Sequence, residues 1–238
     1  MDGTGYVPLV RQSGLMREMQ AVAQNIANVS TTGYRRQGLV FAEHVADLGR
    51  DQPSLSMARA HAHHIDTTQG PLAETGGTFD FAIEGPGFFQ LADGDGVTLS
   101  RAGHFLPDDA GLLSAPDGAH LLDAGGAPVF VPPGARSIVL AADGTLSVDG
   151  RPFAQIAPVT PAEPERLVRQ GGARFAYDGA LEPVAEPAIL QGFLEDSNVD
   201  PVAEIARMIE VQHAYQLGQR FLETEDERTR NVIRTLGK

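Results

Sequence analysis

The stretch NIANVSTTGYRR, residues 25–36, ends the first helical pattern of the chain and decides how the fold is interpreted. Apolar side chains with alternating spacings of four and three residues lead up to and into it: Leu15, Met19, Val22, Ile26 and Val29. This spacing is the a/d stripe of a helix that packs against another helix. The β-branched threonines and Gly33, which tolerates positive φ, predict the end of the helix.

The next helical pattern lies at the other end of the chain. It begins at Asp200, a favourable N-cap, and Pro201 occupies the first helical position. Its stripe comprises Ile205, Met208, Gln212, Tyr215, Gln219 and Leu222, and Ile233 and Leu236 continue it. The polar residues Gln212, Gln219 and Asp226 interrupt this stripe, so the register between the two helices stays open.

The middle of the chain has the period of two that is typical of β-strands. Phe79, Phe81 and Ile83 alternate with Asp80, Ala82 and Glu84. Further strand-like runs lie at 97–99, 129–131, 138–140 and 146–148. Asp-Gly pairs separate these runs, and the stretch SIVLAADGTLSVDG, residues 137–150, predicts a β-hairpin.

The predicted fold class is therefore mixed and mainly β, with helical ends. We expect the N- and C-terminal α-helices to pair as a coiled-coil-like bundle around an inserted all-β domain. The predicted parts are an N-terminal helical segment at 1–34, an extended linker at 35–78, the all-β domain at 79–190 and a C-terminal helical segment at 191–238. Isolated helices are marginal in water, so we expect the end helices to be frayed in a monomer and ordered in an assembly.

Composition excludes several classes of function. There is no cysteine, which excludes disulfides, cysteine zinc sites and thiol nucleophiles. The net charge is −13, and residues 51–200 carry −14 of it, while residues 1–50 carry +1 and residues 201–238 carry zero. A nucleic-acid partner requires a basic stripe, which is absent, whereas near-neutral ends can pack against copies of themselves.

Neither a membrane span nor a signal peptide is expected. The sequence has no run of about 18 apolar residues. Gln20, Gln24 and Asn25 break the apolar positions of the first helix, so no continuous apolar region of a signal peptide exists there.

Two motifs suggest metal binding only weakly. His61, His63 and His64 are types of ligand that bind zinc or nickel, but no cysteine or evident carboxylate ligand accompanies them. Asp93-Gly-Asp95-Gly resembles the start of a calcium loop, yet the later acidic ligands are missing, so tight turns are the favoured interpretation.

Catalytic signatures such as G-x-S-x-G, H-E-x-x-H and Walker A are also absent from the sequence. We predict no metal, no cofactor, no small-molecule substrate and no enzyme.

Separated motifs, in order along nearly the whole chain, resemble the axial proteins of the bacterial flagellum, the rod and hook family. NIANVSTTGYRR is similar to the signature that follows their N-terminal helix. FDFAIEGPGFFQL resembles the strand motif that opens their β-domain, and LSRAGHFLPDDAGLL and FVPPGARSIVLAADGTLSVDG resemble its later hairpins. LEDSNVDPVAEIARMIEVQHAY is similar to the entry into the C-terminal helix.

This resemblance implies a structural subunit of the basal-body rod in the periplasm. Such subunits are exported unfolded through the flagellar type III export apparatus without a cleaved signal. They assemble with copies of themselves and with other rod proteins into a helical tube that transmits torque from motor to hook. The short chain and its ending, QRFLETEDERTRNVIRTLGK, favour a proximal position in the rod, with a distal position as the alternative. A secreted β-domain adhesin with helical arms and a metalloenzyme built on the histidine cluster are the rival hypotheses.

The predicted assembly interface consists of the two helical stripes and the end of the first helix. Its members are Leu15, Met19, Val22, Asn25, Ile26, Asn28, Val29, Gly33, Tyr34, Ile205, Met208, Gln212, Tyr215 and Leu222. We expect Asn25 and Asn28 to form hydrogen bonds at the helix end or across subunits. Gly33 is expected to need a backbone conformation closed to other residues, and Tyr34 to pack against the linker.

Overall fold

The computed structural model describes residues 6–46, 55–94 and 96–236, and the chain divides into two compact units. Unit 1 comprises Met1–Ala27, Gln37–His64 and Asp200–Lys238, and unit 2 comprises Asn28–Arg36 and Ile65–Val199. The structure is mainly β, with helix α1 (Tyr6–Ala27) near the N-terminus and helix α2 (Pro201–Leu236) near the C-terminus. This confirms the mixed, mainly β class with helical ends.

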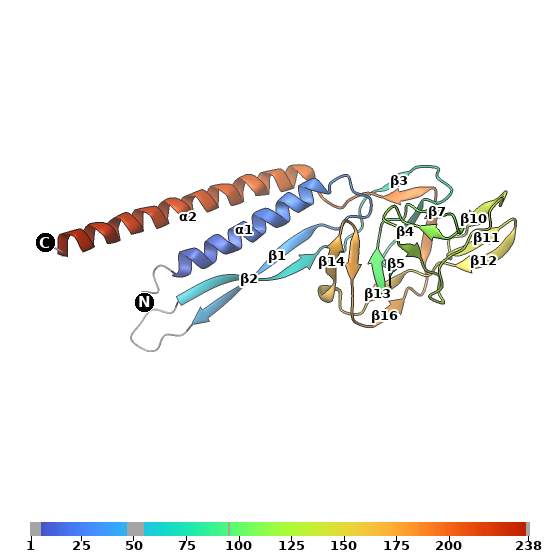
Figure 1. Cartoon of the computed structure of the whole chain (residues 1–238), viewed down its shortest axis with the longest axis horizontal. Coiled ribbons are helices and arrows are strands. Elements are labelled where there is room, and N and C mark those ends of the chain that lie inside the picture. The colour runs from blue at the N-terminus through green and yellow to red at the C-terminus, as the bar shows by residue number, and fades with distance from the viewer. Residues whose placement is uncertain (1–5, 47–54, 95, 237–238) are drawn as a thin grey trace. The chain divides into compact units, whose positions relative to one another are not determined.

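In unit 1, α1 lies beside α2 and beside strand β1 (Gln37–Ala46), as Figure 1 shows. Strand β1 pairs with β2 (Leu55–Ile65) in a two-stranded sheet. The described part of the range expected to be an extended linker, 35–78, thus contains the two paired strands β1 and β2. The alternation within β2 is short and consists mainly of Ala58, Ala60 and Ala62 between polar residues, and alanine is not enriched in strands, so the pairing is not expected from the sequence.

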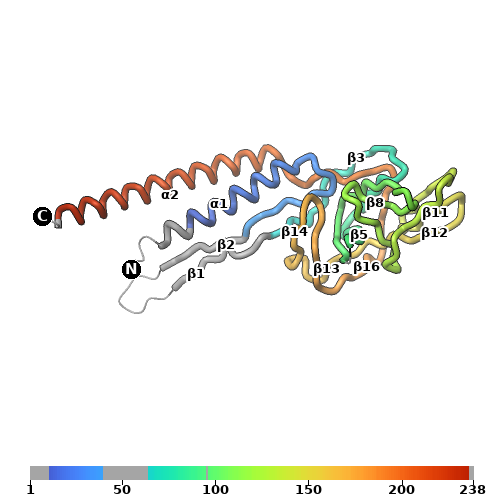
Figure 2. The backbone as a smooth tube through the Cα atoms, viewed as in Figure 1, coloured from blue at the N-terminus to red at the C-terminus, as the bar shows by residue number. Residues whose placement is uncertain are grey.

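Helix α2 begins where the sequence predicts, and Figure 2 traces it as one unbroken helix. Asp200 Oδ1 accepts hydrogen bonds from the backbone N–H groups of Val202 at 2.9 Å and Ala203 at 3.2 Å. Helix α1 ends at Ala27, so Val29, predicted as the last member of the first stripe, lies in the turn that follows. The helix stops earlier because Asn28 starts a turn, in which its carbonyl accepts the N–H of Thr31 at 3.1 Å.

Unit 2 is built from short antiparallel strands and the 3-10 helix η1 (Pro164–Arg166). Among the described residues, the largest sheet has seven strands in the order β14-β15-β6-β5-β9-β8-β7. These strands are β5 (Phe89–Asp93), β6 (Gly96–Ser100), β7 (Leu106–Pro107), β8 (Leu113–Ser114), β9 (His120–Leu121), β14 (Val168–Gly171) and β15 (Arg174–Ala176).

The remaining strands of unit 2 form smaller sheets. Strands β10 (Ile138–Leu140), β11 (Thr145–Val148) and β12 (Arg151–Gln155) form a sheet of their own. The pairs are β13 (Val159–Pro161) with β16 (Leu181–Pro183), β17 (Ala188–Gln191) with β4 (Phe81–Glu84), and β18 (Phe193–Glu195) with β3 (Leu72–Glu74).

The predicted hairpin at 137–150 is confirmed. Strand β10 pairs with β11 from Ile138 opposite Val148 to Leu140 opposite Leu146, with Gly144 at φ +88 in the turn. The predicted strand at 129–131 does not form as a strand, because Phe130 makes an isolated bridge to Leu112 while Val129 and Val131 hydrogen-bond to Leu121 and Gly111. Two prolines follow directly and have no N–H to extend a ladder, which explains the difference.

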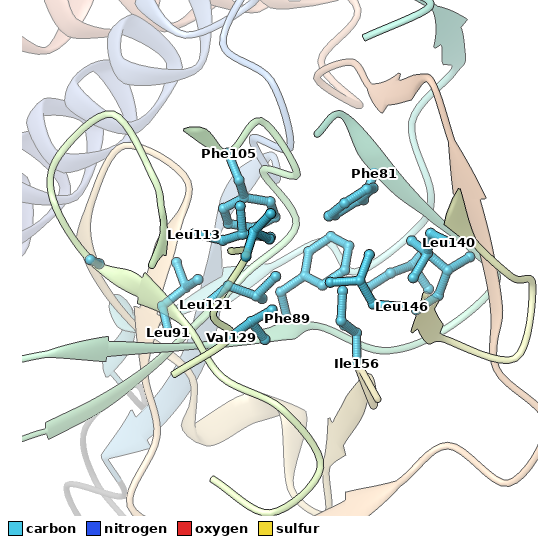
Figure 3. Close-up of a cluster of buried hydrophobic side chains, with 14 residues drawn as sticks. Phe81, Phe89, Leu91, Phe105, Leu113, Leu121, Val129, Leu140, Leu146 and Ile156 are labelled. Carbon is cyan, nitrogen blue, oxygen red and sulfur yellow. The ribbon is translucent and has the colours of Figure 1, made fainter. Parts of the chain in front are cut away.

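The core of unit 2 is a cluster of aromatic and aliphatic side chains (Figure 3). Phe105 packs against Phe81 and Phe89, with ring centroids 6.0 and 5.7 Å away. Phe81 and Ile83, predicted from the period of two, belong to this cluster. Ala82, expected on the opposite face of the same strand, is also fully buried, so β4 is covered on both faces.

Gly33 offers a test of how tightly residues 28–36 dock into unit 2. Gly33 has φ +67, and a Cβ there would overlap the backbone of Arg101 and Ala102. Gly118 has φ +89, but a Cβ there would meet nothing within 4 Å. We expect Gly33→Ala to lower the free energy of unfolding of unit 2 by about 2–4 kcal/mol, because strain and overlap add. Gly118→Ala should lower it by only about 1–2 kcal/mol. Urea unfolding of both variants measures this difference, and equal losses would contradict it.

Candidate assembly interface

The buried face of α1 is made largely of small and polar side chains. Among residues 11–27, whose side chains are described, the buried ones are Gly14, Glu18, Ala21, Val22 and Asn25. Of the predicted stripe, Val22 is buried, whereas Leu15, Met19 and Ile26 are only half-buried. The predicted apolar stripe therefore lies along the border of the buried face and keeps part of its surface uncovered.

The buried face of α2 also differs from the predicted stripe. It consists of Glu204, Met208, Val211, Tyr215, Gly218 and Leu222, each at least partly buried and spaced alternately by four and three residues. The predicted members Met208, Tyr215 and Leu222 belong to this face. Ile205 and Gln212 are exposed, so their placement on this face is corrected. Glu204 is polar whereas its neighbour Ile205 is apolar, so the apolar period starts at Ile205, and continuing it then places Gln212 at the position that Val211 occupies.

Polar contacts fix α1 against α2. Arg207 donates from Nε to Glu18 Oε1 at 2.7 Å, and its terminal nitrogen contacts the same oxygen. The hydrogen bond that Arg207 donates to Glu18 raises the pKa of Arg207 above its ordinary value. Gln12 Nε2 donates to the carbonyl of Tyr215 at 3.2 Å. Since higher residue numbers in α1 face lower numbers in α2, the helices run antiparallel.

Asn25 connects three elements of unit 1. Its Oδ1 accepts the N–H of Gln37 and its Nδ2 donates to the carbonyl of Gln37, both at 2.9 Å. The same Nδ2 donates to Glu204 Oε2 at 3.1 Å. Asn25 thus joins α1 to β1 and α2. Asn28 behaves more locally, since its Oδ1 accepts the hydroxyl of Thr31 at 3.1 Å. The predicted hydrogen bonds at the helix end are therefore present within the chain.

Gly33 and Tyr34 lie in the interior of unit 2. Gly33 has the positive φ predicted for it, and its N–H donates to the carbonyl of Glu195 at 2.7 Å. Tyr34 is fully buried, and the Arg169 guanidinium lies over its ring at 4.2 Å from the centroid. Burial lowers the pKa of Arg169 from its ordinary value. Both motif residues therefore have partners inside the chain.

Large apolar side chains remain exposed on the two helices. Among the residues whose side chains are described, those 41 to 75% exposed on α1 and α2 are Met16, Val202, Ile205, Ile209, Leu217, Phe221, Val232 and Ile233. Val202, Ile205 and Ile209 are spaced by three and four residues, so they share one face of α2. Clustered exposed apolar side chains mark interaction sites.

A groove of roughly 450 Å³ lies between the two helices of unit 1. Its lining residues are Arg11, Gln12, Leu15, Ala214, Leu217, Gly218 and Phe221. Leu15, from the predicted stripe, forms one wall, and the exposed Leu217 and Phe221 form the other. The groove has the apolar character that a helix from another chain requires.

The candidate sites for chemistry receive no support from the described residues. The side chains of His61 and His63 lie outside the part that the structure describes, and His64 is exposed. Within the described ranges, no group of three or more histidine, cysteine or acidic side chains is placed to hold a metal ion. None of the helices in those ranges combines the length and apolar character needed to cross a membrane.

One Ser-His-Asp cluster has the wrong geometry for catalysis. Ser114 Oγ lies 2.9 Å from His120 Nδ1, and Asp108 Oδ2 lies 3.8 Å from the same nitrogen. A catalytic triad needs the serine and the carboxylate on opposite ring nitrogens. The arrangement therefore ties β7, β8 and β9 together and does not activate the serine.

Comparison with known proteins identifies related chains. Residues 82–148 match the family described as the flagellar hook protein FlgE/F/G D1 domain, and residues 190–235 match the flagellar basal body rod FlgEFG protein C-terminal family. The flagellar basal-body rod proteins FlgF of Caulobacter vibrioides and Mesorhizobium japonicum are each 34% identical to this chain, over 100% of it and 99% of their own lengths. The rod protein FlgG of Bacillus subtilis is 30% identical over 96% of this chain and 97% of its own.

Asn25→Ala tests the polar junction between α1, β1 and α2. The substitution removes the amide partner from the backbone of Gln37 and from Glu204, so we expect a loss of about 1–3 kcal/mol in the stability of unit 1. Gln20→Ala, on the exposed side of the same helix, should change stability by less than about 0.5 kcal/mol. Urea unfolding followed by the helical circular dichroism signal distinguishes the two, and indistinguishable curves would refute the role of Asn25.

Proposed function

Because this chain belongs to the flagellar basal-body rod protein family, we propose that it assembles helically, through its terminal helices, with copies of itself and with other rod proteins. The chain is a structural subunit of the rod. The observation that carries the proposal is the apolar surface that α1 and α2 leave exposed, from Met16 to Ile233. We assign no catalytic role, since the relatives carry the names of structural rod proteins.

The helices are suited to contact with neighbouring copies. Helix α2 has 36 residues against 22 in α1, so it is longer by about 21 Å. Val232 and Ile233, near its far end, are exposed. A helix of a neighbouring subunit that covers these side chains would form the coiled-coil-like bundle of the predicted fold. Because the chain ends carry almost no net charge, such helices approach one another without strong repulsion.

The exposed surfaces also suggest how the assembly extends. The stripe of Val202, Ile205 and Ile209 and the groove beside Leu217 and Phe221 lie on different stretches of α2. An interface in which one surface of a subunit binds a different surface of the next is heterologous. Repeated without closure, a heterologous interface produces a helical filament. We infer that this filament is the rod, which transmits torque from motor to hook.

Membership of the family supports a proposal for the position and the export route of the subunit. We infer that it passes unfolded through the flagellar type III export apparatus, without a cleaved signal, and assembles in the periplasm. The absence of cysteine suits a chain that must stay unlinked during export. The relatives named FlgF favour the proximal rod position, and the relatives named FlgG keep the distal position as the alternative.

Ile205→Asp tests whether the exposed apolar stripe mediates assembly. Ile205 is 52% exposed, so the substitution should leave the monomer folded. In an interface it would bury an unpaired carboxylate, which should reduce the number of complete rods and motile cells at least about tenfold. Basal-body electron microscopy and a swimming assay in a deletion strain complemented with the variant measure both effects.

Val139→Asp is the matched control, because Val139 is 53% exposed but lies on β10 of unit 2. It should restore motility like the wild-type chain. Full rescue by Ile205→Asp would refute the assembly role of the stripe. A deletion strain that swims with intact basal bodies would refute the rod function itself.

A further inference from the structure

Two side chains of unit 2 gather the segments through which the chain enters and leaves that unit. The chain passes between the units after residues 27, 36, 64 and 199. The segments of unit 2 that border these positions are 28–36, 65–71 and 195–199. Glu195 and Asn198 contact all of them, although the segments are far apart in the sequence.

Glu195, the last residue of β18, is fully buried at 1% exposure. Its Oε1 accepts hydrogen bonds from the guanidinium of Arg35 and from the backbone N–H of Gly70, the latter at 2.8 Å. Its Oε2 accepts from Arg101 Nε at 2.6 Å. One carboxylate therefore joins the segment after α1, the segment after β2 and the segment before α2.

Asn198 joins the same segments a second time. Its Oδ1 accepts the backbone N–H of Arg36 at 2.6 Å. Its Nδ2 donates to the carbonyls of Asp66 at 3.0 Å and Thr68 at 2.9 Å. The backbone N–H of Asn198 donates to the carbonyl of Tyr34 at 3.3 Å.

Arg101 connects this cluster to the strands of unit 2. It is 1% exposed, and besides Glu195 it donates to the carbonyls of Ile83 at 2.9 Å, Gly85 at 3.0 Å and Gly87 at 2.7 Å. These carbonyls belong to β4 and the turn that follows it. The buried carboxylate is thereby fixed to the body of unit 2.

We propose that Glu195 and Asn198 form a clasp, with Glu195 as its central positioning residue, so that a pull or twist on unit 1 reaches unit 2 through all four connections together. Buried ion pairs are often no better for stability than apolar residues of similar volume. The role of this network is therefore to hold segments 28–36, 65–71 and 195–199 in place relative to one another, and its contribution to the free energy of unfolding is secondary. The proposed function enters only where the pull or twist on unit 1 is identified as the torque that the rod transmits.

Limited proteolysis of the purified full-length chain tests the clasp directly. Trypsin cleaves after Arg35 and Arg36, which the clasp holds, and after Arg136, which is exposed elsewhere in unit 2. Glu195→Gln leaves two guanidiniums without their carboxylate, so cleavage after Arg35 and Arg36 should accelerate at least about tenfold. Cleavage after Arg136 should not change. Glu182→Gln, an exposed position on β16, removes the same charge from the same unit and should leave all rates unchanged.

Two further variants keep the proposal falsifiable if Glu195→Gln fails to fold. Asn198→Ala removes the second junction without leaving a buried charge unpaired, and it should accelerate the same cleavage. The double variant Arg35→Met with Glu195→Gln loses the tryptic site after Arg35 but keeps the site after Arg36. Because Arg35 and Glu195 form one pair, cleavage after Arg36 in the double variant should accelerate by less than the two single substitutions together predict. Unchanged cleavage after Arg36 in Asn198→Ala, or equal acceleration at Arg136, would overturn the clasp.

A second measurement separates the clasp from the rod function. Strains that carry Asn198→Ala should assemble rods but swim more slowly than the wild type as the viscosity of the medium rises. If proteolysis shows the opening and swimming stays normal at every viscosity, the clasp exists but does not carry torque. If the deletion strain has intact rods, the rod function fails while the proteolysis result still decides the clasp.

Discussion

Helix α1 packs against both α2 and β1, whereas α2 packs against α1 and carries apolar side chains on more than one face. The face that each buries within the chain includes Glu18, Asn25 and Glu204. The stripe of Val202, Ile205 and Ile209 is left exposed to solvent. An isolated chain therefore exposes apolar surface on its helices. In the proposed assembly, helices of neighbouring subunits cover this surface.

The polar residues between the helices have a different purpose from the apolar ones outside. The contacts Arg207–Glu18 and Asn25–Glu204 specify which residues of α1 face which residues of α2. Buried polar contacts contribute little net stability but strongly disfavour other registers. The chain thus fixes the register of its two helices with hydrogen bonds, while apolar side chains on α2 stay exposed. This division fits a subunit that must have one shape before it binds.

Features set by neighbouring residues were predictable from the sequence. The hairpin at 137–150 follows from an Asp-Gly turn, the start of α2 follows from Asp200, and the conformation of Gly33 follows from its place after a helix. The pairing of β1 with β2 was missed, because the alternation in β2 consists mainly of Ala58, Ala60 and Ala62 between polar residues, and alanine is not enriched in strands. The buried face of α2 was partly missed for a related reason, since Glu204 and Gly218 occupy positions where a pattern search expects apolar side chains.

The clasp shows the other limit of sequence reasoning. Glu195 and Arg35 are 160 residues apart, and nothing in their local sequences marks them as partners. The motif NIANVSTTGYRR nevertheless contains one half of the network, because Gly33, Tyr34, Arg35 and Arg36 all contact residues between 169 and 198. Asn25, at the start of the motif, docks instead on Gln37 and Glu204 in unit 1. The residues of the motif that have long-range partners thus contact them within the chain. This explains why helix α1 ends within the motif, because the backbone must turn there to bring Gly33–Arg36 to their partners.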